Sequence, residues 1–150
     1  MPGHASAARA SAVSLAALLF LATTSPCSAQ SYAALVWSQL EDHYSQAEAE
    51  GYDSRNYIIG RLNDDEEETW TINLFAGNTY RVTGACDGDC QDIDLVLLNE
   101  DGTELDSDLL VDDVPVLNYT IKATGSYSIR VIMAQCKEDP CYFGLGVFFK

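Results

Sequence analysis

Acidic side chains dominate one stretch of this 150-residue sequence. Eleven of the 27 residues from Asp87 to Asp113 are Asp or Glu, and none is Lys or Arg. Calcium takes six to eight oxygen ligands, which carboxylates gathered on loops can supply. In a strand, Asp92 and Asp94 would point to the same face about 7 Å apart. The stretch therefore predicts a calcium site with six candidate ligands, Asp87, Asp89, Asp92, Asp94, Asp112 and Asp113.

The same acids have a simpler interpretation as a solvated surface that keeps the protein soluble. Arg81 and Arg130 fall on outward positions of predicted strands and could pair with some of them, at little gain for each pair. The stretch is not an EF-hand, because Gly88 occupies the second position of a register starting at Asp87 and the distal Glu is absent.

Four of the five cysteines lie beyond the first 29 residues, and these four could form two disulfide bonds in three ways. The local pairs, Cys86–Cys90 and Cys136–Cys141, are favoured because each pair lies in a turn-rich stretch. The alternative is a zinc ion held by all four thiolates. Such sites usually use C-x₂-C spacing, and cysteines of exported proteins are normally oxidised, so we expect disulfides.

Catalytic machinery is scarce, and no catalytic residue is predicted. His43 is the only histidine outside the N-terminal region, and no G-x-S-x-G nucleophile motif occurs. His43 is expected on a helix surface or at an interface. A pair of carboxylates could hydrolyse a glycoside, so a small secreted hydrolase is the alternative to a non-catalytic protein.

Residues 1–29 have the pattern of a secretory signal peptide. Arg9 precedes an apolar core from Val13 to Ala22, and small residues end at Ala29, after which cleavage is expected. The apolar core is too short to span a bilayer. The sequence therefore predicts a secreted or periplasmic protein with no membrane insertion.

Without residues 1–29 the formal charge is 7 − 23 = −16, because Arg9 is the one base removed and all 23 acids lie beyond residue 40. A surface this acidic repels phosphate backbones and anionic lipids. Nucleic acid is therefore excluded as a partner, whereas cations and basic partners are compatible with the charge.

Residues 31–50 predict an amphipathic helix that ends at Gly51, and with the connection that follows they form an N-terminal segment at 30–60. Residues 56–62 are expected to form a short strand and the acids at 64–68 a solvated turn. The apolar stripe of the helix comprises Ala33, Val36, Trp37, Leu40 and Tyr44.

From Glu68 onward the apolar residues recur at every second position, as in strands with one buried face. Ala76-Gly77-Asn78 is expected to close a β-hairpin. About seven short strands separated by turns predict a mainly β domain over residues 61–150, an antiparallel β-sandwich preceded by one helix. The expected core includes Trp70, Leu95 and Ile129.

Tyr142 and Phe148 fall on the opposite face of the last predicted strand from the core residues. We expect them to pack against the helix through Trp37 and Tyr44, because an amphipathic helix needs an apolar surface to cover. The alternative is an exposed aromatic patch for a protein or a sugar.

Three blocks over about 90 residues resemble the bacterial pre-peptidase C-terminal domain, a small jelly-roll-like β-sandwich of secreted proteins. The blocks are Trp70-x-Ile72-x-Leu74-x-Ala76-Gly77-x-x-Tyr80-x-Val82, then Asp92-x-Asp94-Leu95-x-Leu97 with Asp101-Gly102, then Ala123-x-Gly125-x-Tyr127-x-Ile129-x-Val131. In that family the domain usually follows a secreted peptidase and assists secretion, targeting or substrate attachment, and some relatives in collagenases bind matrix protein and calcium. This chain departs from the family in lacking a peptidase domain and in having a helix and two cysteine pairs.

Together these features predict an exported, non-catalytic accessory or binding module. Its expected ligand is a protein, a peptide or a polysaccharide, and calcium is the one cofactor that the acids suggest.

Overall fold

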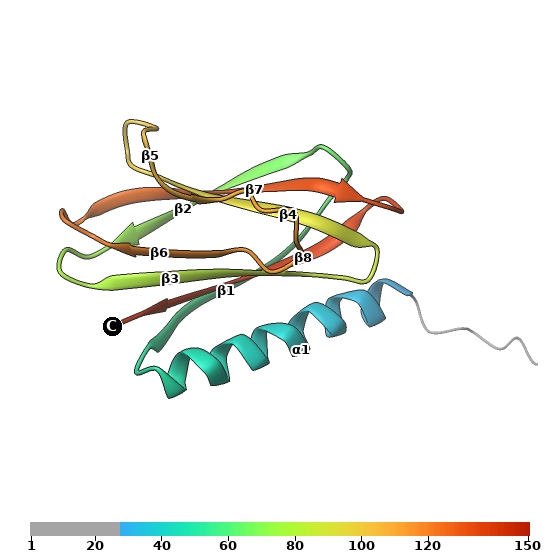
Figure 1. Cartoon of the computed structure of the whole chain (residues 1–150), viewed down its shortest axis with the longest axis horizontal. Helices are drawn as coiled ribbons and strands as arrows, with labels where there is room; N and C mark the ends of the chain where they lie inside the picture. Colours follow the sequence, from blue (N-terminus) through green and yellow to red (C-terminus); the bar gives the residue numbers. More distant parts are fainter. Residues whose placement is uncertain (1–27) are drawn as a thin grey trace, which may run out of the picture.

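The computed structural model describes residues 28–150, so the predicted signal peptide lies almost entirely outside the described residues. These residues form one helix and eight strands (Figure 1). The elements are α1 (Ser28–Ala49), β1 (Asp53–Leu62), β2 (Glu67–Leu74), β3 (Thr79–Cys86), β4 (Cys90–Leu98), β5 (Glu104–Asp108), β6 (Val116–Thr120), β7 (Gly125–Cys136) and β8 (Cys141–Phe149). Within residues 28–150, α1 is not long and apolar enough to cross a membrane.

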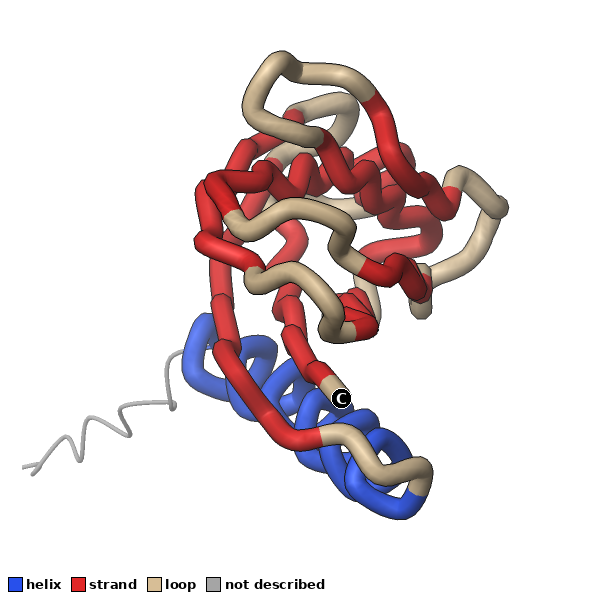
Figure 2. The backbone as a smooth tube through the Cα atoms, turned by 90° about the vertical axis from the view of Figure 1, so that its left-hand side faces the viewer, coloured by secondary structure: helices blue, strands red, loops and turns tan. Residues whose placement is uncertain are grey.

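The strands form two antiparallel sheets of four strands each, which confirms the predicted β-sandwich. The helix-side sheet has the order β1-β8-β3-β6, and the outer sheet has the order β2-β7-β4-β5. Figure 2 shows the helix lying below the sandwich, against one sheet only. The predicted core holds, because Leu95 and Ile129 are fully buried between the sheets and Trp70 packs against them half-buried.

Two local predictions were wrong. The acids at 64–68 are not all in a turn, because Glu67 and Glu68 belong to β2 and pair with Ile132 and Val131 of β7. The turn around Gly77 does not close a hairpin, because β2 lies in the outer sheet and β3 in the helix-side sheet. A turn between sheets preserves the same alternation of buried residues as a hairpin, so the pattern alone does not distinguish the two.

Helix α1 packs on the helix-side sheet through Val36 and Leu40, which are fully buried. Gly144 on β8 makes this close approach possible, since a Cβ atom there would lie 2.6 Å from Cγ1 of Val36. The predicted stripe is therefore confirmed at its centre. Trp37 departs from it, because 42% of its surface is exposed and its ring contacts Tyr57 edge-on.

The aromatic side chains on the outer face of β8 dock against the helix, as expected. Phe148 is fully buried in a cluster with Ala47, and Tyr44 packs against this cluster. Tyr142 packs beside Val36, at the other end of the helix. The helix thus covers the face that would otherwise be an aromatic patch.

Candidate functional site

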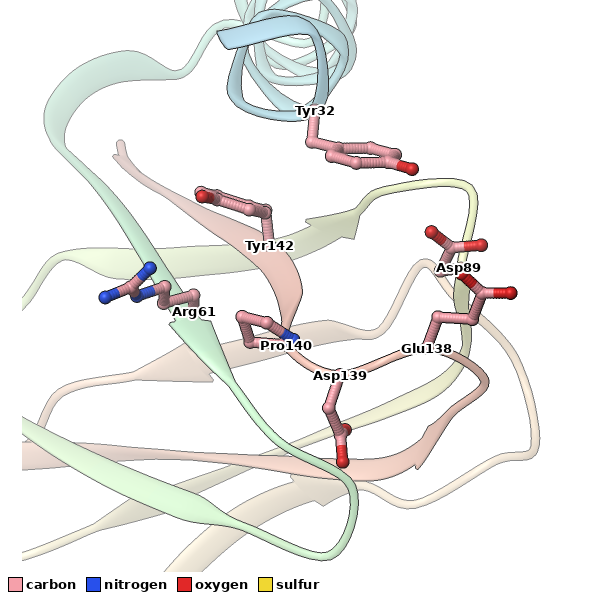
Figure 3. A pocket seen from close by; sticks show the side chains of 7 residues that line it. All are labelled: Tyr32, Arg61, Asp89, Glu138, Asp139, Pro140 and Tyr142. Atoms are coloured by element: carbon pink, nitrogen blue, oxygen red, sulfur yellow. The ribbon is translucent and has the colours of Figure 1, made fainter. Parts of the chain in front are cut away.

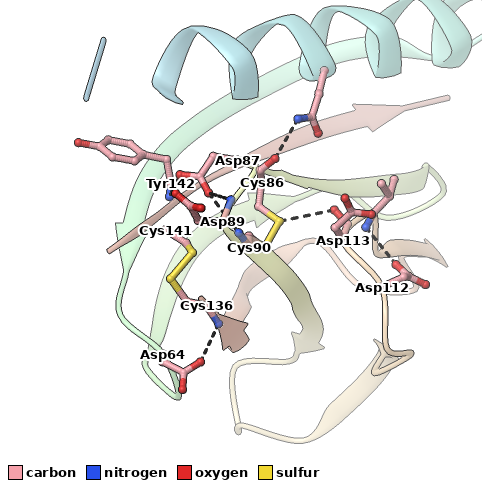
Figure 4. Close-up of a disulfide and its surroundings, with 12 residues drawn as sticks. Asp64, Cys86, Asp87, Asp89, Cys90, Asp112, Asp113, Cys136, Cys141 and Tyr142 are labelled. Carbon is pink, nitrogen blue, oxygen red and sulfur yellow. Dashed lines mark hydrogen bonds between the residues drawn. A yellow bond between two sulfur atoms is a disulfide. The ribbon is translucent and has the colours of Figure 1, made fainter. Parts of the chain in front are cut away.

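The two disulfide bonds are Cys86–Cys90 and Cys136–Cys141, the local pairs that the sequence favours (Figure 4). Each bond joins the end of a strand in one sheet to the start of a strand in the other. Cys90 and Cys136 are partners in the β4–β7 ladder, so the bonds lie side by side. We call this end of the sandwich the disulfide end. With all four sulfur atoms oxidised, no thiolate remains there to hold zinc.

At the disulfide end, two connections join the sheets, β3–β4 and β7–β8, and Asp87 links them. Its side chain is 3% exposed. One carboxylate oxygen accepts hydrogen bonds from the backbone amides of Asp89 and Cys90, and the other accepts one from the amide of Tyr142 at 2.8 Å. Because these bonds occupy both carboxylate oxygens, Asp87 is a structural cap and not an open metal ligand.

The six candidate calcium ligands do not come together as one site. Among residues 28–150, no three His, Cys, Asp or Glu side chains are placed to hold a metal ion. Asp87 caps backbone amides, and Asp112 likewise accepts a hydrogen bond from the amide of Val114 at 3.0 Å. The stretch is acidic largely because its turns use carboxylates as hydrogen-bond acceptors, a role that the sequence pattern does not separate from metal binding.

Asp92 and Asp94 do share a face, as predicted, and they lie half-buried on the outer face of β4. Burial raises the pKa of both carboxyls, and the nearby charges of Asp92, Asp108 and Asp112 raise the pKa of Asp94 further. Within the described residues, Oδ1 of Asp92 has no hydrogen-bond partner. These residues form the β4 acid cluster, which comprises Asp92, Asp94, Asp108 and Asp112.

An open depression of about 300 Å³ lies at the disulfide end (Figure 3). The rings of Tyr32 and Tyr142 stack on one side of it, with centroids 6.1 Å apart. The carboxylate of Asp89 raises the pKa of the Tyr32 hydroxyl by a hydrogen bond. The depression is lined by Tyr32, Arg61, Asp89, Glu138, Asp139, Pro140 and Tyr142.

A hydrolase with a carboxylate pair needs a carboxyl of raised pKa inside a concave site. In this structure the two features are apart. The carboxyls of raised pKa, Asp92 and Asp94, lie on the outer face of β4 and do not line the depression. The geometry therefore does not favour the hydrolase alternative.

Apolar side chains are exposed along the connection between β5 and β6, residues 109–115, which together with Val116 at the start of β6 we call the apolar loop. Three consecutive side chains project into solvent, with exposed fractions of 57% for Leu109, 67% for Leu110 and 83% for Val111. Val114 and Val116 are also exposed. Exposed apolar side chains that cluster in this way are typical of surfaces that bind another protein.

Backbone hydrogen bonds hold the apolar loop to both sheets. The carbonyl oxygen of Asp112 accepts a bond from the amide of Ile93 in the outer sheet at 3.1 Å. The carbonyl oxygen of Pro115 accepts one from the amide of Gly84 in the helix-side sheet at 2.8 Å. Gly84 is required there, because a Cβ atom would lie 2.6 Å from Cγ of Pro115. The loop is therefore pre-organised, which lowers the entropic cost of binding.

Acids of β5 also shield the edge of the helix-side sheet. The carboxylates of Asp106 and Asp108 accept hydrogen bonds from the amides of Asn118 and Val116, at 3.0 and 2.9 Å. These amides point outward from the edge strand β6, where an unpaired edge would invite strand addition. The amides of Val116 and Asn118 are therefore not free to pair with an added strand.

Sequence reasoning missed the apolar loop, although a signal was present. Leu109, Leu110 and Val111 are consecutive, so they cannot all face the core of a strand with alternating sides. Aspartates flank them at positions 108 and 112, which argues against burial of the segment.

Of two bases considered from the sequence, Arg81 has a different partner from the one predicted, whereas His43 lies at one of its two predicted places. Arg81 forms an ion pair with Glu50 at the end of the helix, with 2.7 Å between Nη2 and Oε2, and not with the acids of 87–113. His43 lies at the interface between helix and sheet, where its Nδ1 is 3.1 Å from the hydroxyl of Thr83. Burial lowers the pKa of His43.

Comparison with protein-family models gives no match, and comparison with curated proteins gives none either. Among solved structures, the chain is similar to PliG of Aeromonas hydrophila, described as a periplasmic lysozyme inhibitor of g-type lysozyme. The two are 14% identical over 67% of this chain and 90% of PliG, with a TM-score of 0.50. This likeness shows the β-sandwich fold, and the resemblance to pre-peptidase C-terminal domains stays a prediction.

Proposed function

We propose that this protein is an exported, non-catalytic module that binds another protein through the apolar loop. The observation that carries the proposal is the exposure of Leu109, Leu110 and Val111 on a segment fixed to both sheets. Burying such side chains against a partner releases about 25 cal/mol for each Å² of apolar surface removed from water. Because the loop is already ordered, little of that gain is lost in fixing its conformation.

An extracytoplasmic location fits the two disulfide bonds and the predicted signal peptide. A binding role without catalysis fits the separation between the raised-pKa carboxyls and the depression at the disulfide end. A protein is preferred to a sugar as the ligand, because the exposed side chains are aliphatic, whereas sugars are usually bound by aromatic platforms and polar groups.

The target of PliG gives the first partner class to assay. PliG is described as an inhibitor of g-type lysozyme. We propose a protein of that class as the first candidate partner of this chain, with inhibition of its activity as the readout. A lysozyme that is bound and inhibited would support the proposal, and it would define the partner more narrowly than the loop alone does.

A photo-crosslinking amino acid at Val111 tests the proposal directly. The matched control carries the same amino acid at Ala34, an exposed position on helix α1. We expect a discrete covalent adduct with g-type lysozyme or with one protein of the exported fraction from position 111, and none from position 34. Equal yields of adduct from the two positions would contradict a binding role for the apolar loop.

A further inference from the structure

We infer that the partner bound by the apolar loop is a basic protein, whose positive charges surround an apolar recess that receives the loop. This inference rests on the proposed function and adds the chemistry of the partner. It is carried by the charges that the fold places around the loop.

The apolar loop is surrounded by carboxylates. Asp108 precedes it, and Asp112 and Asp113 lie within it. Asp92 and Asp94 stand beside it on β4, close enough for the charges of Asp108 and Asp112 to raise the pKa of Asp94. The tip of the loop is therefore an apolar patch inside an acidic rim, which is the arrangement of a polar-rimmed protein interface.

Within residues 28–150, no base forms an ion pair with this rim. Arg81 forms the one ion pair found within residues 28–150, and its partner is Glu50 of the helix–β1 connection. Arg55 donates a hydrogen bond to the carbonyl oxygen of Asn73, and Lys150 lies over the ring of Tyr52. Within the described residues, Asp92, Asp94, Asp108, Asp112 and Asp113 thus form no ion pair with a base, and Arg130, which is opposite Val96 in the β4–β7 ladder, is not paired with them either.

This potential selects among possible occupants. A second copy of the chain would bring a second acidic rim against the first, and an anionic membrane would be repelled in the same way. A basic protein gains from the same field, because complementary charge raises association rates by about 10-fold to 1,000-fold and suppresses wrong partners. The charges of the rim would speed association, and burial of the apolar tip would slow dissociation.

Binding kinetics with a g-type lysozyme of high isoelectric point as the probe test this inference. The charge variant is Asp112→Asn with Asp113→Asn, since an Asn at 112 keeps the acceptor for the amide of Val114. The matched control is Glu67→Gln with Glu68→Gln, which removes two charges from β2 at the opposite edge of the outer sheet. A second form of the probe has its lysines acetylated.

We expect the charge variant to slow association by about 3-fold to 10-fold and the control to change it by less than about 2-fold, since rim charges act mainly on the association rate. Raising sodium chloride from about 20 mM to about 200 mM should slow association of the wild-type chain about 10-fold, because the salt screens the exposed charges. Acetylation of the probe should have a similar effect.

Failure of the basic-partner inference and failure of the proposed binding function give different binding kinetics. Suppose that Val111→Ser speeds dissociation, but association does not respond to salt, to the charge variant or to acetylation of the probe. The proposed binding function would then stand, and the inference of a basic partner would be overturned. Unchanged kinetics for Val111→Ser would overturn the binding role of the loop and this inference with it. No binding of the unmodified probe at about 20 mM salt would overturn the basic-partner inference.

Discussion

The carboxylate of Asp87 accepts a hydrogen bond from the backbone amide of Tyr142 at 2.8 Å, across 55 positions of sequence. The bond ties the β3–β4 crossing to the start of β8, beside the two disulfide bonds. The disulfide end is thus fixed by covalent bonds and by one buried carboxylate. The apolar loop passes next to it, and the carbonyl oxygen of Asp113 lies 3.9 Å from Sγ of Cys86.

Asp87→Ala is expected to lower the free energy of unfolding by about 2–4 kcal/mol, because the amides of Asp89 and Tyr142 lose their acceptor and the amide of Cys90 keeps only the backbone carbonyl oxygen of residue 87. Urea unfolding at neutral pH measures the change. Asp113→Ala is the control, since this exposed side chain should change stability by less than about 0.5 kcal/mol. Equal midpoints for the two variants would show that the Asp87 carboxylate does not hold the crossings together.

How much the sequence could reveal depended on which physical signal each feature leaves. Burial on one face of a strand leaves a period of two, so Leu95 and Ile129 were placed in the core correctly. Sheet membership leaves no such signal, so the alternation around Gly77 predicts a hairpin although β2 and β3 lie in different sheets. The local disulfide pairs followed from short, turn-rich spacing.

The candidate site was only partly predictable. The charge of Asp112 suggests a metal ligand, but in the structure its carboxylate accepts a hydrogen bond from the amide of Val114. Its carbonyl oxygen accepts one from the amide of Ile93, which holds the loop to β4. The importance of Leu110 and Val111 depends on their exposure, which sequence alone does not give. Apolar residues are usually buried, and only the structure shows that these are not.

Asp94→Asn is expected to raise the melting temperature at pH 7 by about 1–3 °C. The pKa of Asp94 is higher in the folded protein than its ordinary value of 3.8, mainly through burial, so its ionised form disfavours folding. The gain from Asn is present above the folded-state pKa and disappears as pH falls below 3.8. Melting curves from pH 7 down to about pH 3 measure this dependence.

The opposite sign at pH 7, with Asp94→Asn melting below the wild-type chain, would contradict this account of the β4 acid cluster. Asp53→Asn serves as the control, because Asp53 is also a strand carboxylate but is exposed. Its replacement should leave the melting temperature nearly unchanged.

Replacing Cys86 and Cys90 together by Ser is expected to lower the free energy of unfolding by about 2 kcal/mol, as loop-closure entropy predicts for a ring this short. Replacing Cys136 and Cys141 should have a similar effect, since the two rings are nearly equal in length. Denaturant unfolding measures both. A chain that loses no stability in either double variant would show that the bridges do not contribute to holding the sheets together.

Calcium is expected to change the melting temperature by less than about 1 °C relative to a chelator. The carboxylates of Asp87 and Asp112 already accept hydrogen bonds from backbone amides, so they are poorly placed to bind an ion. Thermal melts with about 5 mM calcium chloride and with an equal concentration of chelator give the comparison. A rise of several degrees with calcium would contradict this expectation and support the sequence-based prediction of a metal site. Asp92→Asn and Asp94→Asn would then show whether the β4 acid cluster holds the ion.

The most direct test of the account is the affinity of the partner captured at Val111 for a variant with Leu110→Ser and Val111→Ser. Calorimetry should give a dissociation constant raised at least about 10-fold, as expected for central apolar contacts of an interface. The melting temperature should stay unchanged, because both side chains are exposed before binding. Leu35→Ser, which alters an exposed apolar residue of α1, should bind like the wild-type chain. An affinity of the loop variant equal to that of the wild-type chain would contradict the central claim.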